Sequence, residues 1–258
     1  MQINLEESRD PIETEFSKGN NYVIETKDLW RIYPLKSSPQ GGIEALRGVN
    51  LRIQTGRFVA LKGRSGSGKT TLMNCLAGLD QPSSGSIRIL GHYLDQMSEQ
   101  ELTNWRREQI GLVFQSFGLL PTLSAYENVE LLLRIKGEDY NSRNNRALEC
   151  LEMVGLSAWR NHRPYEMSGG QQQRVAVARA LANRAKLILA DEPTGELDSK
   201  TTHELLSLFR KLVEDEKITF LMVSHDPLVN QHAHEVLFLK DGNLVQDDEL
   251  NDASCRDL

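Results

Sequence analysis

The chain has 258 residues, of which 39% are hydrophobic, enough to bury a core and form one large domain. Against 30 Lys and Arg residues stand 36 Asp and Glu, and this net charge of −6 disfavours a nucleic acid as the main partner. The three separated cysteines, Cys75, Cys150 and Cys255, are expected to be free thiols in a reducing compartment. The polar, acidic start does not resemble an export signal, and no apolar run reaches the ~18 residues of a membrane span. We therefore expect a protein that is soluble or peripheral to a membrane through a partner.

The first third of the chain predicts antiparallel strands and then a strand–turn–helix unit. Residues 1–21 carry little apolar material and are expected to form a flexible acidic tail. Alternation over 22–34 and 43–53 predicts two antiparallel stretches, with "KSSPQGG" as the loop between them. The apolar strand "RFVALKG" at 57–63 runs into a glycine-rich turn, and helical spacing follows over 69–79.

The middle of the chain changes character. A further strand is predicted at 85–91, and three segments with helical periodicity and charge follow at 97–109, 125–137 and 141–156. These segments indicate a helical subdomain inserted at about 97–167.

The last third alternates helices and strands, as parallel βαβ units do. The expected elements are a helix at 170–185, a strand at 186–192, a helix at 200–216, a strand at 218–226 and a hairpin at 234–245 that turns at Asp241-Gly242. The whole pattern predicts one α/β domain over 22–250, with an antiparallel β-subdomain and the inserted helices, and a C-terminal tail at 251–258.

The segment "GRSGSGKT" at 63–70 fits the phosphate-loop pattern G-x-x-x-x-G-K-[ST], and it lies between a strand and a helix as that pattern requires. Glycines let the backbone N–H groups wrap a phosphate, Lys69 would reach the β- and γ-phosphates, and the Thr70 hydroxyl would ligate Mg²⁺. A plain flexible Gly/Ser turn is the alternative, and the context disfavours it. The predicted nucleotide-binding residues here are Gly63, Arg64, Ser65, Gly66, Ser67, Gly68, Lys69, Thr70 and Thr71.

A second apolar strand, "KLILADEP" at 186–193, ends in two carboxylates. Asp191 would hold Mg²⁺ from the strand end beside the phosphate loop. Glu192 lies one residue further, where it can face the γ-phosphate and orient or deprotonate the attacking water. Solvated acids at a strand end are the alternative, which loses weight next to a phosphate loop.

Five further motifs carry a resemblance to a known family. After the phosphate loop come Gln115, which follows a strand ending in "LVF", then "SGGQ" at 168–171, "LADEPT" at 189–194, "GELD" at 195–198 and "VSHD" at 223–226. Present in this order, they resemble an ABC-type ATPase, and the resemblance covers essentially the whole chain after about residue 22. It implies the P-loop NTPase fold of ABC ATPases and hydrolysis of ATP.

The resemblance implies that two chains pair head to tail and sandwich two ATP molecules. Ser168, Gly169, Gly170 and Gln171 open a helix, and a helix N-terminus is a suitable site for an anion. They would bind the ATP that the other subunit holds. The ordinary alternative is a surface helix with Ser168 as its N-cap, and both roles are compatible.

The same resemblance assigns the remaining site residues. Gln115 would contact Mg²⁺ and the water, His225 would hold the γ-phosphate, Glu192 and the water, and Asp198 would lie at the dimer seam. Tyr33 matches the aromatic residue that stacks on adenine, with Trp30 as a nearby competitor.

The chain also departs from the family pattern in four places. Met167 stands where Leu is common and Thr70 where Ser is frequent, and both replacements keep the chemistry. Lys62 replaces a usually apolar residue, and Glu196 adds a negative charge at the seam.

Among ABC ATPases, the motor of a transporter fits best. The chain has one cassette and no long coiled coil, and its motifs resemble the group of lipoprotein-releasing, macrolide-exporting and cell-division ATPases. We expect an ATP-hydrolysing homodimer, peripheral at the cytoplasmic face of the cell membrane, which drives a separate integral membrane subunit. Its coupling helix would dock in an apolar groove supplied by Phe117, Leu119, Leu120 and Leu123.

Two alternatives remain open at this point. One is a soluble ABC ATPase that acts on nucleic acid or ribosomes. The other is a regulatory nucleotide-binding module without turnover, which the intact Glu192 and His225 disfavour. The cargo, the direction of transport and a heterodimer with a related ATPase are not decided by the sequence.

Overall fold

A computed structural model describes residues 21–34 and 42–245. The predicted tails at 1–21 and 251–258 lie outside the described residues, apart from Asn21, and so do residues 35–41, which include most of the loop predicted at 36–42.

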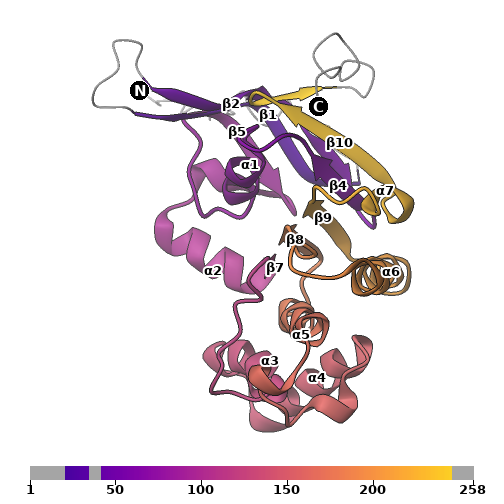
Figure 1. Ribbon diagram of the computed structural model, residues 1–258. Helices are drawn as coiled ribbons and strands as arrows, with labels where there is room; N and C mark the ends of the chain where they lie inside the picture. Colours follow the sequence, from indigo (N-terminus) through magenta and orange to yellow (C-terminus); the bar gives the residue numbers. More distant parts are fainter. Residues whose placement is uncertain (1–20, 35–41, 246–258) are drawn as a thin grey trace, which may run out of the picture.

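The strands form two sheets, which Figure 1 shows above and at the middle of the molecule. The antiparallel sheet contains β1 (Tyr22–Tyr33), β2 (Ile43–Val49), β3 (Arg52–Gln54), β5 (Ser84–Ile89) and β6 (His92–Tyr93). The second sheet has the order β11-β10-β4-β9-β8-β7, and its strands are β4 (Phe58–Lys62), β7 (Ile110–Phe114), β8 (Leu187–Asp191), β9 (Thr219–Val223), β10 (Glu235–Lys240) and β11 (Asn243–Val245). All its neighbouring pairs are parallel except β10 and β11. The expected α/β fold with an antiparallel β-subdomain is confirmed.

The second sheet lies at the centre of the molecule and is called the central sheet below. Both of its faces are covered, and this explains why its strands are apolar along their whole length. In β4 the side chains of Phe58 and Ala60 join one buried cluster, whereas Val59 and Leu61 join the other. The second cluster also contains residues of β1, β3 and β5 and of α1 (Lys69–Leu76), so α1 is packed between the two sheets.

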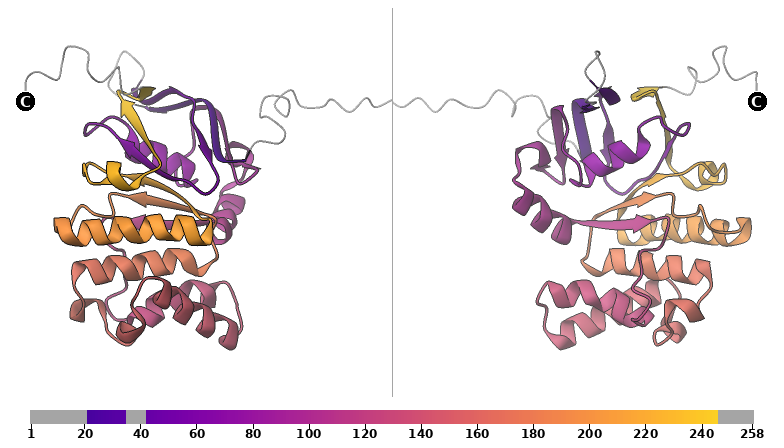
Figure 2. Two further views of the ribbon diagram at one scale, coloured as in Figure 1. Left: turned by 90° about the vertical axis from the view of Figure 1, so that its right-hand side faces the viewer. Right: turned by 60° about the vertical axis from the view of Figure 1, so that its left-hand side comes forward.

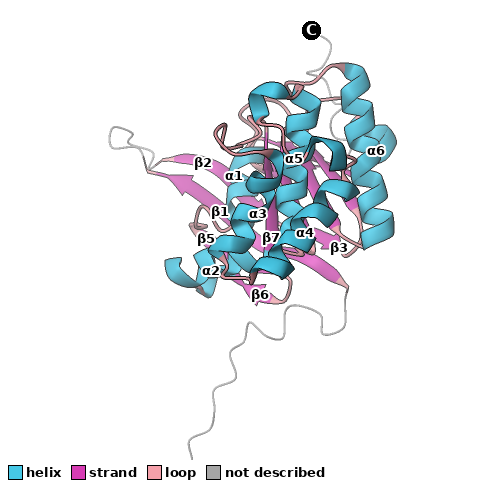
Figure 3. Cartoon of the chain, turned by 90° about the horizontal axis from the view of Figure 1, so that it is seen from below, coloured by secondary structure: helices cyan, strands magenta, loops and turns pink. Residues whose placement is uncertain are grey.

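Two long helices cover the opposite face of the central sheet. Figure 2 shows α5 (Gly169–Ala182) and α6 (Ser199–Glu216) as long helices beneath it, and in Figure 3 they lie in front of its strands. Helices α3 (Ala125–Ile135) and α4 (Tyr140–Met153) pack below α5, while α2 (Glu99–Gln109) and the short α7 (Val229–His232) flank the sheet.

The segment expected to form the helical subdomain contains one strand of the central sheet. Strand β7 pairs in parallel with β8, from Ile110 opposite Leu187 to Phe114 opposite Asp191. In addition, Leu102 and Trp105 of α2 are buried in the cluster shared with α1. The subdomain boundary at about residue 97 stays a prediction, and this pairing favours a limit after Phe114 instead.

The predicted hairpin turn is confirmed. Asp241 and Gly242 have φ values of 48° and 82°, the left-handed pair that a tight two-residue turn between antiparallel strands requires. The Gly242 carbonyl accepts a hydrogen bond from Arg47 N, which joins the hairpin to β2.

Helix α5 approaches β7 so closely that only glycine fits at one position of the strand. A Cβ on Gly111 would lie 2.4 Å from the Ala180 carbonyl oxygen and 2.4 Å from Ile188 Cδ1. We expect Gly111→Ala to destabilise the protein by about 3 kcal/mol, the upper range for overpacking. Denaturant unfolding measures this.

Gly91→Ala is the matched control for this substitution. Gly91 has a φ of 85° but nothing within 4 Å of its hypothetical Cβ, so only backbone strain of about 1 kcal/mol is expected. Equal losses in the two variants would contradict a close helix–strand contact at Gly111.

Candidate nucleotide site

The phosphate loop connects β4 to α1, and two of its glycines are required by close approaches of the backbone. A Cβ on Gly63 would lie 2.2 Å from the Leu239 carbonyl oxygen, and one on Gly68 would lie 2.4 Å from that of Ala45. Gly68 is also the N-cap of α1, with a φ of 102° and no side-chain hydrogen bond to the helix.

The free N-terminus of α1 distinguishes it from its neighbours. Among the described helices of eight or more residues, each of the other five has a side-chain N-cap, from Ser98, Ser124, Asp139, Ser168 or Asp198. The first N–H groups of α1 therefore have no internal acceptor, which makes this end a suitable place for a phosphate.

Lys69 is folded back onto the loop that it ends. Its Nζ donates to the carbonyl oxygens of Gly63 and Arg64, each at 2.9 Å, and only 5% of the residue is exposed. Burial lowers the pKa of Lys69, and the negative charges of Glu192 and Asp191 oppose this shift. The cation is thus held beside the two carboxylates by loop carbonyls that a phosphate could replace.

The two carboxylates stand at the end of β8. Burial raises the pKa of Asp191, and so does the charge of Glu192, while a hydrogen bond from Thr70 and the charge of Lys69 oppose the rise. Glu192 has a φ of 46°, and its N–H donates to the Val223 carbonyl oxygen at 3.0 Å. Because the backbone leaves the extended conformation at Glu192, the carboxylates of Asp191 and Glu192 point in different directions.

His225 contacts Glu192. Its Nε2 lies 2.8 Å from Glu192 Oε1, with 49% and 29% of the two side chains exposed. His225 belongs to the turn after β9, where the Ser224 N–H donates to the Leu61 carbonyl oxygen of β4. Neutral or protonated, the imidazole can hold the carboxylate in one orientation next to open space.

Both carboxylates, Asp191 and Glu192, line a polar cleft of about 470 Å³. It is lined by Thr70, Phe114, Gln115, Ser116, Asp191, Glu192 and Glu196. Hydroxyl, amide and carboxylate oxygens are ligands that Mg²⁺ accepts, and Thr70, Gln115 and Asp191 supply one of each. The donor set therefore fits the expected metal.

Tyr33 is held by two charged neighbours. Its hydroxyl donates to Asp80 Oδ2 at 2.6 Å, and the guanidinium of Arg31 lies 4.4 Å from the ring centroid and also pairs with Asp80. In the sheet Tyr33 stands opposite Ile43, two residues before the Ala45 carbonyl that lies against Gly68. Its competitor Trp30 donates its indole N–H to Asp28. Adenine stacking on Tyr33 stays a prediction.

The signature residues open helix α5. Ser168 is the N-cap, and it exchanges hydrogen bonds with Gln171, so the ordinary capping role is present. A Cβ on Gly170 would lie 2.3 Å from Thr201 Cγ2, which places α5 directly against the start of α6. Asp198 caps α6 through the Thr201 N–H and hydroxyl. None of these residues lines the polar cleft described above, and their expected contact with the partner's ATP stays a prediction.

Some contacts were not predicted from the sequence. Phe114 and Ser116, the neighbours of Gln115, also line the cleft, and their adjacency was the available signal. The Asp80 contact with Tyr33 spans 47 positions and had no local signal. Lys62, noted for its charge, donates to Asn230 Oδ1 of α7 at 3.1 Å.

The phosphate loop, the carboxylate pair and the histidine together define a P-loop ATPase. The profile of the ABC transporter family matches residues 46–195. MJ0796, an ABC transporter ATP-binding protein of Methanocaldococcus jannaschii, is 47% identical over 235 residues, which cover 88% of this chain and 97% of that protein. The chain belongs to the ABC transporter ATP-binding family.

Two further comparisons place it within that family. The dimeric structure of MJ0796 bound to ADP and Pi has a TM-score of 0.77 and 43% identity, and covers 86% of this chain and 97% of the other. The macrolide export ATP-binding/permease protein MacB of Syntrophobacter fumaroxidans is 44% identical over 222 residues, but the match covers only 31% of its length. These relatives support ATP hydrolysis and do not support the nucleic-acid alternative. Within the described residues, no helix has the length and apolar character of a membrane span.

The unfavourable environment of the Asp191 carboxylate leads to a stability prediction. Its raised pKa means that the folded state disfavours the charge, so stability is lost as the pH rises through that pKa. At pH 7.5, without nucleotide or metal, Asp191→Asn should raise the thermal midpoint by about 2–4 °C, roughly 1 kcal/mol for a domain of this size. Solvent screening of a half-buried carboxylate limits the gain.

Asp198→Asn serves as the control, with the opposite expectation. Hydrogen bonds from Thr201 lower the pKa of Asp198, so its charge is favourable and the midpoint should fall. If Asp191→Asn also lowered the midpoint at pH 7.5, the carboxylate would not be destabilising.

Proposed function

We propose that this chain is the ATP-hydrolysing subunit of an ABC transporter complex, peripheral at the cytoplasmic face of the cell membrane. Two copies would close around two ATP molecules and drive a separate integral membrane subunit, in export, lipoprotein release or mechanical signalling. The contact of His225 with Glu192 beside the polar cleft carries the hydrolytic part of this proposal.

The residues divide the work of hydrolysis. The N–H groups of residues 63–71 and the start of α1 bind the phosphates, and Lys69 exchanges the carbonyls of Gly63 and Arg64 for phosphate oxygens. Thr70, Gln115 and Asp191 would hold Mg²⁺, which when bound neutralises charge that develops on the phosphates. Glu192 accepts the proton of the attacking water, and His225 keeps its carboxylate turned toward that water.

The position of the signature residues and the relatives both support a dimer. The N-terminus of α5 lies outside the cleft that Asp191 and Glu192 line, so ATP in that cleft leaves the signature free for a second copy. MJ0796 is dimeric in its structure with ADP and Pi. A head-to-tail pair completes both sites at once, because each surface meets its complement on the other copy.

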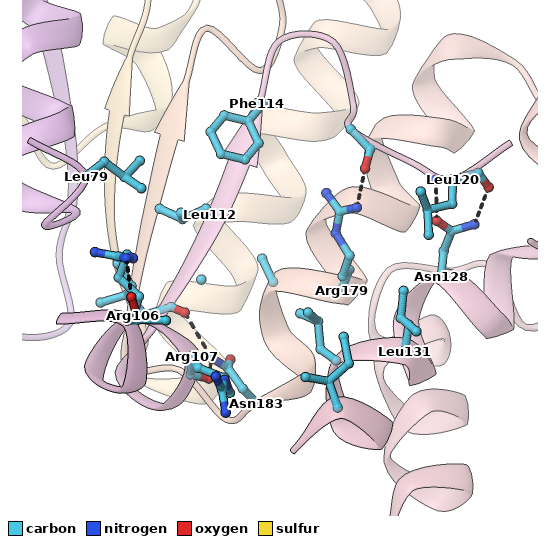
Figure 4. A pocket seen from close by; sticks show the side chains of 17 residues that line it. Leu79, Arg106, Arg107, Leu112, Phe114, Leu120, Asn128, Leu131, Arg179 and Asn183 are labelled. Carbon is cyan, nitrogen blue, oxygen red and sulfur yellow. Dashed lines mark hydrogen bonds between the residues drawn. The ribbon is translucent and has the colours of Figure 1, made fainter. Parts of the chain in front are cut away.

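The membrane subunit would dock on a groove of about 550 Å³ between α2 and β7 on one side and α3 and α5 on the other. Figure 4 shows apolar side chains and arginines facing this groove together. Four of the large apolar residues exposed in the described chain line it, namely Leu79, Phe114, Leu120 and Ile135. Such a contiguous apolar surface is typical of an interaction site.

The groove also has a charge preference. Arg106, Arg107 and Arg179 line it, and no Asp or Glu is among its lining residues in the described chain. An amphipathic helix with a carboxylate beside its apolar face is the complementary occupant.

Of the four apolar residues expected here, Leu120 lines the groove. Phe117 instead lies against Gly169, Leu119 packs on the buried cluster, and Leu123 is not among the residues that line the groove.

The catalytic assignment predicts the behaviour of Glu192→Gln. The variant should lose at least about 100-fold in ATPase rate, since the group that accepts the proton is gone. It should still bind ATP and elute as a dimer in size-exclusion chromatography with ATP and Mg²⁺. Lys69→Ala, which lacks the phosphate contact, should elute as a monomer under the same conditions.

Glu204→Gln, the same change on the exposed face of α6, is the activity control and should hydrolyse ATP at the wild-type rate. Normal hydrolysis by Glu192→Gln would refute the assignment of Glu192. Absence of hydrolysis in the wild type would favour the regulatory module without turnover.

The docking groove is tested by capture from native membranes. Glu192→Gln protein with ATP and Mg²⁺ should retain a multi-span membrane protein, which mass spectrometry identifies. Adding Ile135→Asp should reduce the retained amount about tenfold, because a carboxylate in the groove breaks the apolar contact and repels the acidic helix, a loss of about 1.4 kcal/mol.

Tyr140→Asp changes a residue of the same subdomain that is 63% exposed but outside the groove, and should leave capture intact. Recovery of ribosomal or DNA-bound proteins alone would instead favour the soluble class.

A further inference from the structure

Helix α5 holds the loop that carries Gln115, at more than one point. Arg179 donates to the carbonyl oxygen of Phe117 at 3.0 Å and to that of Gly118. Figure 4 shows its guanidinium directed at this loop. At the start of the helix, Phe117 Cζ lies 3.7 Å from the position that a Cβ on Gly169 would occupy. The signature end of α5 and the loop after β7 are therefore in direct contact.

A third contact comes from Gln173, the last glutamine of "GGQQQR". Its side chain is completely buried, and its Nε2 donates to the Phe114 carbonyl oxygen at 3.3 Å. Only the amide NH₂ group can face a carbonyl oxygen, so the orientation of this amide is fixed by its partner. The other amide atom, Oε1, is buried without a hydrogen-bond partner.

The stability of the fold does not explain why a buried glutamine stands at position 173. The Phe114 carbonyl also accepts from the Phe117 N–H at 3.3 Å, so it would remain satisfied without Gln173. A buried acceptor without a partner costs free energy, which an apolar side chain of similar size would avoid. A polar group kept at such a cost points to a role in function.

The connectivity indicates that role. Gln173 lies on the first turns of the helix whose N-cap is Ser168, and the carbonyl that it holds is bonded directly to Gln115 N. One side chain thus connects the helix end that would face the partner's ATP to the residue that would contact Mg²⁺ and water in its own cleft.

We propose that Gln173 is a positioning residue that couples the two ATP sites. When ATP on the partner seats against Ser168 and Gly169, α5 moves as a rigid rod and Gln173 carries the Phe114 carbonyl and Gln115 with it. The unpaired Oε1 is then available to N–H groups of the displaced loop. This inference rests on the proposed dimer, in which the signature residues bind ATP in trans.

Gln173→Met in the full chain tests the proposal, because Met keeps the volume and removes both polar atoms. We expect kcat for ATP hydrolysis to fall about tenfold, the size of a typical coupling between sites, with KM within about twofold of wild type. The Hill coefficient should fall from near its two-site limit of about 2 toward about 1. The thermal midpoint should be equal to or above that of the wild type.

Gln172→Met is the matched control. The Gln172 amide donates to the Met167 carbonyl within its own helix start and does not reach the loop. This variant should keep kcat within about twofold of wild type, since no coupling contact is removed.

Hydrogen exchange gives a second, direct readout. In the Glu192→Gln background, ATP and Mg²⁺ should protect both the phosphate loop and residues 115–118. With Gln173→Met added, the phosphate loop should stay protected while residues 115–118 lose at least about half of their protection.

The outcomes separate this inference from the proposed function. Unchanged kcat and unchanged protection in Gln173→Met would overturn the coupling role while leaving the proposed function intact. A lowered thermal midpoint together with a lower kcat and a higher KM would make Gln173 a structural residue. This result would also overturn the coupling role. In Glu192→Gln protein that keeps Gln173, ATP could fail both to protect the phosphate loop and to induce a dimer. That result would refute the proposed function, and the inference with it.

Discussion

Parallel pairing of four strands is the constraint on which the site depends. Leu61 of β4 stands opposite Val223 of β9, Val223 stands opposite Asp191 of β8, and Asp191 stands opposite Phe114 of β7. Because the strands end in register, the four segments that follow them begin at one edge of the sheet. The phosphate loop, Glu192, His225 and Gln115 meet there although they are far apart in the sequence. A slip of one residue in any pair would send the wrong side chain into the cleft.

Several groups that lower the stability of the folded protein lie at this same edge of the sheet. The Asp191 carboxyl and the buried Lys69 have shifted pKa values, and α1 begins without a side-chain cap. Each of these features costs stability, and each would become favourable with a phosphate and a cation bound. Stability is thus lowered where binding later restores it, which is the usual relation between stability and activity at a functional site.

Local patterns in the sequence were enough for most elements and for the main site residues. Amphipathic periodicity located α2 to α6, and the phosphate loop and the acidic strand end were recognisable because short motifs with fixed spacing determine them. Resemblance to ABC ATPases added Gln115 and His225, and the structure brings His225 to Glu192. The roles of these residues in hydrolysis stay predictions.

Contacts between distant segments could not be predicted in the same way. A strand directly before Gln115 was expected from the motif order. Its place beside β8 was not predictable, because it depends on packing against α5, about 70 residues further along the sequence. For the same reason the docking groove combines residues from α2, β7, α3 and α5, and Phe117, whose apolar character suggested the groove, instead lies beside Gly169. Apolar character indicates burial but does not say against which neighbour.

The contact between Gly170 and Thr201 has a mechanical consequence. With Thr201 Cγ2 only 2.3 Å from where a Cβ would be, the starts of α5 and α6 abut with no free space between them. Packed interiors compress very little, so two helix ends in such contact share any translation along the line that joins them. Ser168 and Asp198 are the N-caps of these two helices. A displacement that pushes the start of either helix toward the other is therefore expected to move both caps together.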